Sequence, residues 1–517
     1  MKFHYTVIDS LPPLAWLARI SGEDIDVLCG ERVERTDAFF VEGAWAGAYT
    51  EGLFDEAEWL CGSGARLREN DAVFAAPTGM HAGLYYLQEN GRVTVCNSLP
   101  FLMAEAGYEF DPAYIGYDTF FQYNILQGIH GYKPDVPVRK AGAKTFPAEG
   151  TGIRMLLFRN LTVSRDGAIL EALKPDTEGF DCFEAYYARL VQTMKALTAN
   201  AQDPARRFRY GVTSFISSGY DAACCSAVAK EAGADKVMTF AAIGRYAQDS
   251  GVGAARQLGY ETVIERDAYA YKSRDDFPEI VYLGGGDIGT GISFSSFVAD
   301  CRGCLVYSGE NGDFVWSRPA GFQSVNDDVH IVWKNSEVSL WESHLHQGYI
   351  PVPMTNYGIR HWTDLYRISN SKAMDPWSVG GGYDRPIPRR ILEEKGLARD
   401  SFGHDKRGAG FFYAYDWKRR ILRRMSPRSA ESFSQYVAAH RSPAPLAAIL
   451  RYCWANRAIY TSALLRKLGL APGAETDGAA IEKRNSIPNP FAARYLIPWA
   501  GERVIAAYRD ALGEQKK

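Results

Sequence analysis

The most informative segment of this chain is Tyr210-Gly-Val-Thr-Ser-Phe-Ile-Ser-Ser-Gly-Tyr-Asp221. Its first seven residues alternate like a buried strand, and the run from Asp221 to Gly233 predicts a helix with a glycine stop. Ser217, Ser218 and Gly219 form a small-residue turn between the two. Such a turn directs several backbone N–H groups at one point, where the helix dipole also favours an anion such as phosphate. Asp221, in the first helical turn, could hold a divalent cation that bridges phosphates.

This loop differs from the two best-known phosphate-binding patterns. No G-K-[ST] follows it, so it is not a Walker loop, and it does not have the form G-x-G-x-x-G. Taken alone, a tight turn in an ordinary α/β domain explains it equally well.

The residues that follow predict a complete nucleotide-binding type of sheet. Strands are expected at Lys236–Ala242 and Glu261–Glu265, with a helix over Ala247–Gly259 between them. A further strand begins at Cys304 and runs into the small, acidic loop Ser308-Gly-Glu-Asn-Gly-Asp313. Alternating strands and helices predict a doubly wound parallel sheet with ligands at the carboxyl ends of its strands. Both acidic loops would then lie at one sheet edge, as a magnesium-bound triphosphate requires.

These motifs, in this order, resemble the asparagine synthetase family, which includes beta-lactam synthetase and lasso-peptide cyclases. The resemblance identifies Ser217–Asp221 with the pyrophosphatase loop S-G-G-x-D-S, and Ser308–Phe314 with the segment S-G-E-G-x-D-E. It implies that Ser217, Ser218, Gly219, Asp221, Ser308 and Gly309 bind ATP, that Asp221 and Asp313 bind Mg²⁺, and that Glu310 is an active-site glutamate. Lys406, in Lys406-Arg-Gly-Ala-Gly-Phe411, is the candidate for the family's catalytic lysine. Three positions depart from the pattern, namely Ser218, Ala222 and Phe314.

The N-terminal region resembles the glutaminase domain of the same family. Glu42-Gly-Ala-Trp-Ala-Gly-Ala-Tyr49 and His81-Ala-Gly-Leu-Tyr-Tyr86 correspond to strands of an Ntn-type β-sandwich flanked by helices. A working glutaminase of this type needs a cysteine directly after the initiator methionine, but this chain begins Met1-Lys2-Phe3. We therefore expect no glutamine hydrolysis. The expected domains are a degenerate glutaminase-like domain over 1–178 and an ATP pyrophosphatase domain with a helical C-terminal part over 179–517.

The composition limits the class of protein but does not indicate a substrate. The 517 residues are 46% hydrophobic and 23% charged, with a net charge of −3, which gives no argument for nucleic acid or an anionic membrane. Nine scattered cysteines favour a reducing cytoplasm. We find neither a signal peptide nor an apolar stretch long enough to span a bilayer.

The resemblance implies an AMP-forming amide ligase that adenylates a small-molecule or peptide carboxylate and joins it to an amine, within one molecule or between two. A homodimer is possible. Alternatives are a non-catalytic nucleotide-binding relative, and a glutamine-independent, asparagine-type synthetase that uses ammonia. Sulfur insertion into a tRNA base would call for a basic face and catalytic cysteines, and the negative net charge speaks against it. A simple hydrolase would call for a nucleophile elbow or triad spacing, and the sequence supports neither.

Overall fold

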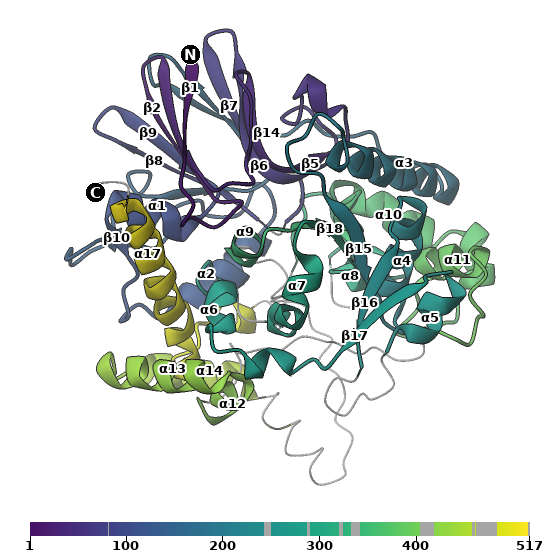
Figure 1. Cartoon of the computed structure of the whole chain (residues 1–517). Coiled ribbons are helices and arrows are strands. Elements are labelled where there is room, and N and C mark those ends of the chain that lie inside the picture. The colour runs from purple at the N-terminus through teal and green to yellow at the C-terminus, as the bar shows by residue number, and fades with distance from the viewer. Residues whose placement is uncertain are drawn as a thin grey trace.

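The computed structural model describes residues 1–80, 82–241, 250–286, 290–319, 324–331, 342–403, 418–457, 461 and 483–514. Two six-stranded sheets form the N-terminal region, and a five-stranded sheet with surrounding helices forms the rest (Figure 1). The protein is thus of mixed α/β class, as the sequence predicts.

The two N-terminal sheets pack face to face around one apolar cluster that includes Trp16, Phe40 and Phe74. Apart from the parallel pair β1 and β3, neighbouring strands in both sheets are antiparallel. The first sheet has the order β1 (Lys2–Val7), β3 (Asp24–Cys29), β2 (Trp16–Ser21), β9 (Arg92–Cys96), β8 (Leu84–Glu89) and β12 (Arg154–Leu156). The second has the order β14 (Ile169–Leu173), β13 (Arg159–Ser164), β7 (Asp71–Ala75), β6 (Leu60–Arg68), β5 (Phe39–Trp45) and β4 (Glu34–Arg35).

Short helices and one small ribbon complete this region. The 3₁₀-helices are written η. The elements are η1 (Tyr49–Glu51), α1 (Leu99–Ala106), α2 (Tyr117–Gln122), η2 (Asn124–Leu126) and the pair β10 (Tyr108–Glu109) with β11 (Arg139–Lys140).

The third sheet is entirely parallel, and its strand order reverses in the middle. The order is β17 (Thr262–Arg266), β16 (Lys236–Phe240), β15 (Gly211–Phe215), β18 (Cys304–Ser308) and β19 (Ile350–Pro353). The chain builds outward from β15 in one direction and then returns to add β18 on its other side. In open α/β sheets such a reversal leaves a crevice at the carboxyl ends of the two central strands.

Helices surround this sheet and fill the space below the N-terminal sandwich (Figure 1). They are α3 (Phe183–Ala201), α4 (Tyr220–Glu231), α5 (Val252–Gln257), η3 (Ala270–Ser273), α6 (Pro278–Leu283), η4 (Thr290–Phe297), α7 (Val298–Cys301), α8 (Gly312–Val315), α9 (Glu342–Gln347), η5 (Met354–Asn356), η6 (Ile359–His361), α10 (Trp362–Ser369), η7 (Lys372–Trp377), α11 (Pro386–Glu394), α12 (Lys418–Arg424), α13 (Pro427–Ala439), α14 (Leu446–Ala455), η9 (Ala492–Tyr495) and α17 (Leu496–Glu514).

The sequence-based expectations for the sheet hold closely. β15, β16, β17 and β18 lie within about a residue or two of the predicted strands, and α4 covers the predicted helix. The helix expected over Ala247–Gly259 is shorter in the described residues, where α5 begins at Val252 after Gly251. Among the described residues, no helix is long and apolar enough to cross a membrane.

One large apolar cluster joins the N-terminal region to the helices of the C-terminal part. Phe101 of α1 stacks on Tyr508 of α17 with 4.7 Å between ring centroids, and Leu14 and Trp316 belong to the same buried cluster. The sandwich and the parallel sheet therefore share a core.

Candidate functional site

The two loops singled out in the sequence meet at the strand-order reversal. Ser217–Asp221 follows β15 and opens α4, and Ser308–Asp313 follows β18 and opens α8. Because β15 and β18 are hydrogen-bonded neighbours, both loops lie at the same carboxyl edge of the sheet. We call these two loops together with Arg385 the sheet-edge site.

Glycines let the second loop press directly on the start of α4. A Cβ atom added to Gly309 would lie 2.6 Å from the amide nitrogen of Ala222, and one added to Gly312 would lie 2.6 Å from Cγ of Asp221. Real Cβ atoms essentially never come this close to other heavy atoms. Asn311, between them, adopts a left-handed backbone with φ +65°, which asparagine tolerates better than most residues. These residues bring Asp221 next to the acidic loop.

Gly219 is different, because neither its backbone nor its protein neighbours demand a glycine. Its φ is −81°, and an added Cβ would meet only the hydroxyl oxygens of Ser217 and Tyr383, at 3.4 Å and 3.5 Å. Ser217 Oγ accepts a hydrogen bond from the Gly219 amide at 3.2 Å. A small residue here leaves the space in front of the loop open to a ligand.

The N-terminus of α4 carries no side-chain cap among the described residues. Gly219 occupies the N-cap position, where an acceptor such as serine or aspartate would usually satisfy the first amides. The uncapped N–H groups and the helix dipole favour an anion at this end.

Arg385, which the sequence analysis did not single out, completes the sheet-edge site. Its guanidinium donates through Nη1 to Oδ2 of Asp221, and its side chain is only 4% exposed. Burial alone would lower the pKa of Arg385, but the carboxylates of Asp221 and Asp313 outweigh it and hold that pKa above its ordinary value. The carboxylates of both predicted magnesium ligands therefore stabilise the positive charge of Arg385.

The position of Arg385 on its own helix explains why it needs a partner. It is the N-cap residue of α11, directly before Pro386, and a cation at a helix N-terminus opposes the helix dipole. An arginine at this position needs a carboxylate from elsewhere, which is here Asp221, 164 residues earlier.

The donor set fits a magnesium ion held jointly with phosphates. Oδ1 of Asp221 is buried and has no hydrogen-bond partner among the described residues. Mg²⁺ typically takes one or two carboxylates and completes its shell with phosphates and water. Correspondingly, no group of three or more His, Cys, Asp or Glu side chains in the described residues could hold a metal by itself.

The remaining predicted residues have distinct surroundings. Ser308 is buried, and its hydroxyl has no hydrogen-bond partner among the described residues. The backbone carbonyl of Glu310 accepts a hydrogen bond from Thr355. Phe314, where the resemblance expects a glutamate, packs against the large apolar cluster, and its carbonyl accepts from Nε1 of Trp362 at 3.2 Å.

α11 and the chain that follows it contact the first loop. The Gly403 amide donates to the Ser218 carbonyl at 2.9 Å. Arg389 donates to the Tyr220 hydroxyl and stacks on the rings of Tyr220 and Phe402. Lys406, the predicted catalytic lysine, lies outside the described residues.

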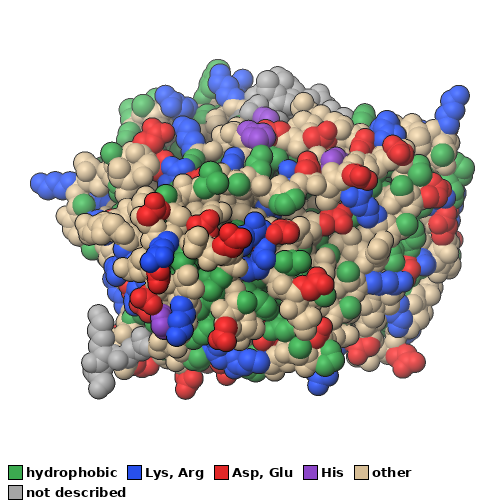
Figure 2. Space-filling model, turned by 90° about the horizontal axis from the view of Figure 1, so that it is seen from above, with side chains coloured by type: hydrophobic (Ala, Val, Ile, Leu, Met, Phe, Trp, Pro, Cys, Tyr) green, Lys and Arg blue, Asp and Glu red, His purple; other side chains and the backbone are tan. Residues whose placement is uncertain are grey.

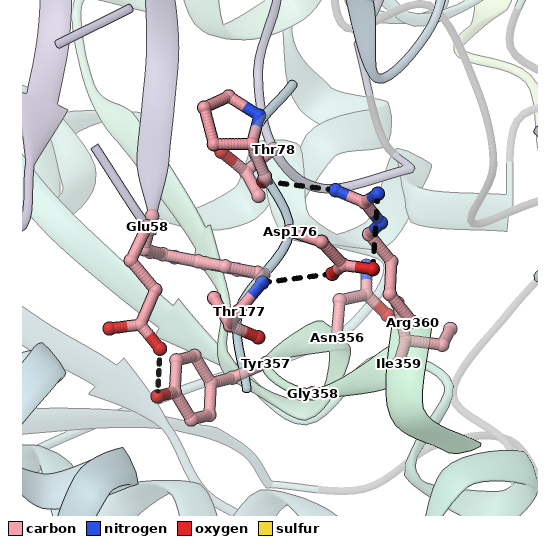
Figure 3. A pocket seen from close by; sticks show the side chains of 11 residues that line it. Glu58, Thr78, Asp176, Thr177, Asn356, Tyr357, Gly358, Ile359 and Arg360 are labelled. Carbon is pink, nitrogen blue, oxygen red and sulfur yellow. Dashed lines mark hydrogen bonds and ion pairs between the residues drawn. The ribbon is translucent and has the colours of Figure 1, made fainter. Parts of the chain in front are cut away.

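A separate polar pocket lies between the sandwich and the parallel-sheet region (Figure 3). We call it the junction pocket; its lining includes Glu58, Asp176, Tyr357 and Arg360. The Tyr357 hydroxyl donates to Glu58 at 2.6 Å, and Arg360 lies 3.4 Å from Asp176. Asp176 and Arg360 are thus paired with each other, and no predicted site residue lines the pocket.

Lys174 is buried next to this pocket. Its carbonyl accepts from Arg360 at 3.2 Å, while its Nζ has no hydrogen-bond partner among the described residues. Burial lowers the pKa of Lys174 to about 7, with Arg360 lowering it further and Asp55 opposing the shift. Burying an amine without a hydrogen-bond partner costs stability.

No model of a protein family matches the chain, and no curated protein sequence does. The residues of the sheet-edge site are therefore the basis for proposing a function.

Proposed function

We propose that the protein is an ATP-dependent, AMP-forming amide ligase of the asparagine synthetase type, with an Ntn-like sandwich that hydrolyses no glutamine and an ATP-pyrophosphatase-like parallel-sheet region. The observation that carries the proposal is the meeting of two acidic loops at the strand-order reversal, against an uncapped helix N-terminus. This combination supplies amides for phosphate, carboxylates for a metal, and a crevice for the nucleotide.

In the proposed reaction a substrate carboxylate oxygen attacks the α-phosphorus of ATP, giving an acyl-adenylate and pyrophosphate. An amine then attacks the acyl carbon, and AMP leaves as the amide forms. The backbone amides around the Ser217–Gly219 turn, where α4 begins, would bind the departing pyrophosphate. Bound Mg²⁺, held by Asp221 and Asp313, would neutralise phosphate charge.

Other residues of the chain would position and stabilise the reacting groups. Arg385 would orient Asp221 and, once a metal takes that carboxylate, offer its own charge to the phosphates. Glu310 would accept a proton from the amine or orient it, and Lys406 keeps its predicted role of stabilising the negative charge that develops. Holding acyl and amine groups in one pocket would contribute much of the rate.

The proposal includes no step that hydrolyses glutamine. Free ammonia, an external amine or the substrate's own amine would then supply the nitrogen.

The test is ATP–pyrophosphate exchange with magnesium across a panel of carboxylates, with AMP measured separately after an amine is added. We expect exchange with at least one carboxylate, and an at least hundredfold loss in Asp313→Asn, because a metal ligand is removed. The matched control is Glu261→Gln, which alters an exposed carboxylate directly before β17. This variant should retain full exchange. ADP release in place of AMP would overturn the proposal. ATP binding without any exchange would favour the non-catalytic alternative.

A further inference from the structure

Helix α14 (Leu446–Ala455) carries an apolar ridge that stands in solvent. Seven large apolar side chains among the described residues are strongly exposed, and three of them lie on this one helix. Leu446 is 69% exposed, Leu450 is 61% and Trp454 is 70%. Spacings of four residues place them on the same helix face. We call these three residues the α14 ridge.

The face of α14 opposite the ridge contacts the rest of the protein at one point. There Tyr452 is buried, and its ring meets the edge of Phe491 at 5.8 Å between centroids. Asn456, the C-cap residue of the helix, is buried as well. α14 is therefore attached through Tyr452 and its C-terminal end, and the ridge lies on the exposed face.

Basic side chains accompany the ridge. Arg451 and Arg457 are both exposed, and the Arg457 guanidinium lies 4.2 Å from the centroid of the Trp454 ring. Between residues 418 and 457 the sequence has nine Lys and Arg and a single acidic residue, Glu431, although the whole chain has a net charge of −3. The basic residues are Lys418, Arg419, Arg420, Arg423, Arg424, Arg428, Arg441, Arg451 and Arg457.

The helices that carry these charges gather at one end of the molecule. α12, α13 and α14 lie together at the lower edge of the view, away from the sandwich (Figure 1). The Tyr495 hydroxyl of η9 donates to the His440 carbonyl at 3.3 Å, and Arg494 donates to the Ser442 carbonyl at 2.6 Å, which ties the α13–α14 connection to η9. On the face seen from above, by contrast, acidic and basic side chains are interspersed (Figure 2).

We propose that the α14 ridge docks the protein onto the surface of an anionic lipid bilayer. A convex helix face with two leucines and a tryptophan, flanked by arginines, has the composition of helices that lie in the membrane interface. Tryptophan prefers the headgroup level, and arginine can bury its aliphatic stem while its guanidinium reaches lipid phosphate.

Charge decides between a membrane and a second copy of the chain. Two copies that met through this ridge would bring two strongly basic segments together, and like charges at an interface oppose association. An anionic bilayer attracts the same segment, and each Arg near its surface strengthens binding about fivefold. With one short helix inserted, binding would be peripheral and reversible.

The test is sedimentation of the full chain with vesicles of phosphatidylcholine alone or mixed with phosphatidylglycerol. We expect binding to the mixed vesicles only, with an affinity that falls as salt rises. Leu450→Ser combined with Trp454→Ser should weaken binding at least about tenfold, because two apolar side chains lose their burial in lipid. Arg451→Glu with Arg457→Glu should weaken it similarly. Leu170→Ser, which alters a side chain 63% exposed on β14, is the matched control and should bind normally.

Three results would overturn the proposal. One is no sedimentation with phosphatidylglycerol vesicles, and another is binding that the ridge variants leave unchanged. The third is a dimer in sedimentation velocity that Trp454→Ser abolishes, which would make the ridge an interface between copies. Brominated lipid offers a second readout, since it should quench tryptophan fluorescence in the wild type and distinctly less in Trp454→Phe.

Discussion

The sheet-edge site and the junction pocket both contain charged residues inside the protein, but the partners of these charges differ. In the junction pocket Asp176 pairs with Arg360, and Glu58 accepts a hydrogen bond from Tyr357. At the sheet-edge site Asp221 pairs with Arg385 through one oxygen, while its other oxygen has no hydrogen-bond partner among the described residues and α4 begins without a side-chain cap. A carboxylate with a spare oxygen at an uncapped helix N-terminus, more than charge itself, marks the sheet edge as a candidate binding site.

Removing the Asp221–Arg385 pair as a unit should have the largest effect on the sheet-edge site. Asp221→Asn alone would leave a buried arginine short of a partner and destabilise the fold, which confounds a loss of activity. In Asp221→Asn with Arg385→Met both charges are gone, so we expect near-normal thermal unfolding and a loss of AMP formation of about a thousandfold. Calorimetry and AMP release measure the two effects. Full activity in the double variant would make the pair structural.

Lys174 offers the converse test on the junction side. Its folded pKa of about 7 lies below the ordinary 10.5, so the folded state favours the neutral amine. The resulting penalty is complete below pH 7 and disappears as pH rises toward 10.5, because over that range the unfolded chain binds the proton more readily. Lys174→Met should raise the free energy of unfolding by about 5 kcal/mol near pH 6 and flatten its rise with pH.

Urea unfolding at several pH values measures this effect, and ATP–pyrophosphate exchange serves as the control. Exchange should be unchanged, because Lys174 lies outside the sheet-edge site. A variant less stable than the wild type would mean that Lys174 makes favourable interactions in its protonated form.

Two glycines of the sheet-edge site, Gly309 and Gly219, should respond differently to replacement by alanine, with smaller effects than the variants above. Gly309→Ala would drive a Cβ atom into the backbone of α4, so we expect a loss of about 2 kcal/mol in unfolding free energy. Gly219→Ala has room and an ordinary φ, so its stability should stay within about 0.5 kcal/mol of the wild type. Its ATP affinity should fall about tenfold, since the methyl group stands where phosphate would approach. A Gly219→Ala variant that is less stable but binds ATP normally would show that no ligand occupies the space beside Gly219.

The sheet and its two loops could be predicted because their signals are local. β15 and β18 are apolar runs that end in small residues, and α4 follows β15 directly in the sequence. Arg385 was missed because its partner Asp221 is 164 residues away, and only tertiary packing joins them. The burial of Lys174 was missed for a related reason, since it follows β14 at the start of a polar, turn-rich segment that predicts exposure. The role of Lys406 stays a prediction.

The apolar cluster that unites Leu14, Phe101 and Tyr508 has a consequence for how the protein can be handled. Independent domains usually meet through modest, fairly polar interfaces and can be expressed apart. Here a separation near residue 178 would expose core side chains on both fragments, and neither would be a sound substitute for the whole. Melting should accordingly proceed as one cooperative event, and ligand binding at the sheet edge would protect the distant sandwich against heat and proteases as well.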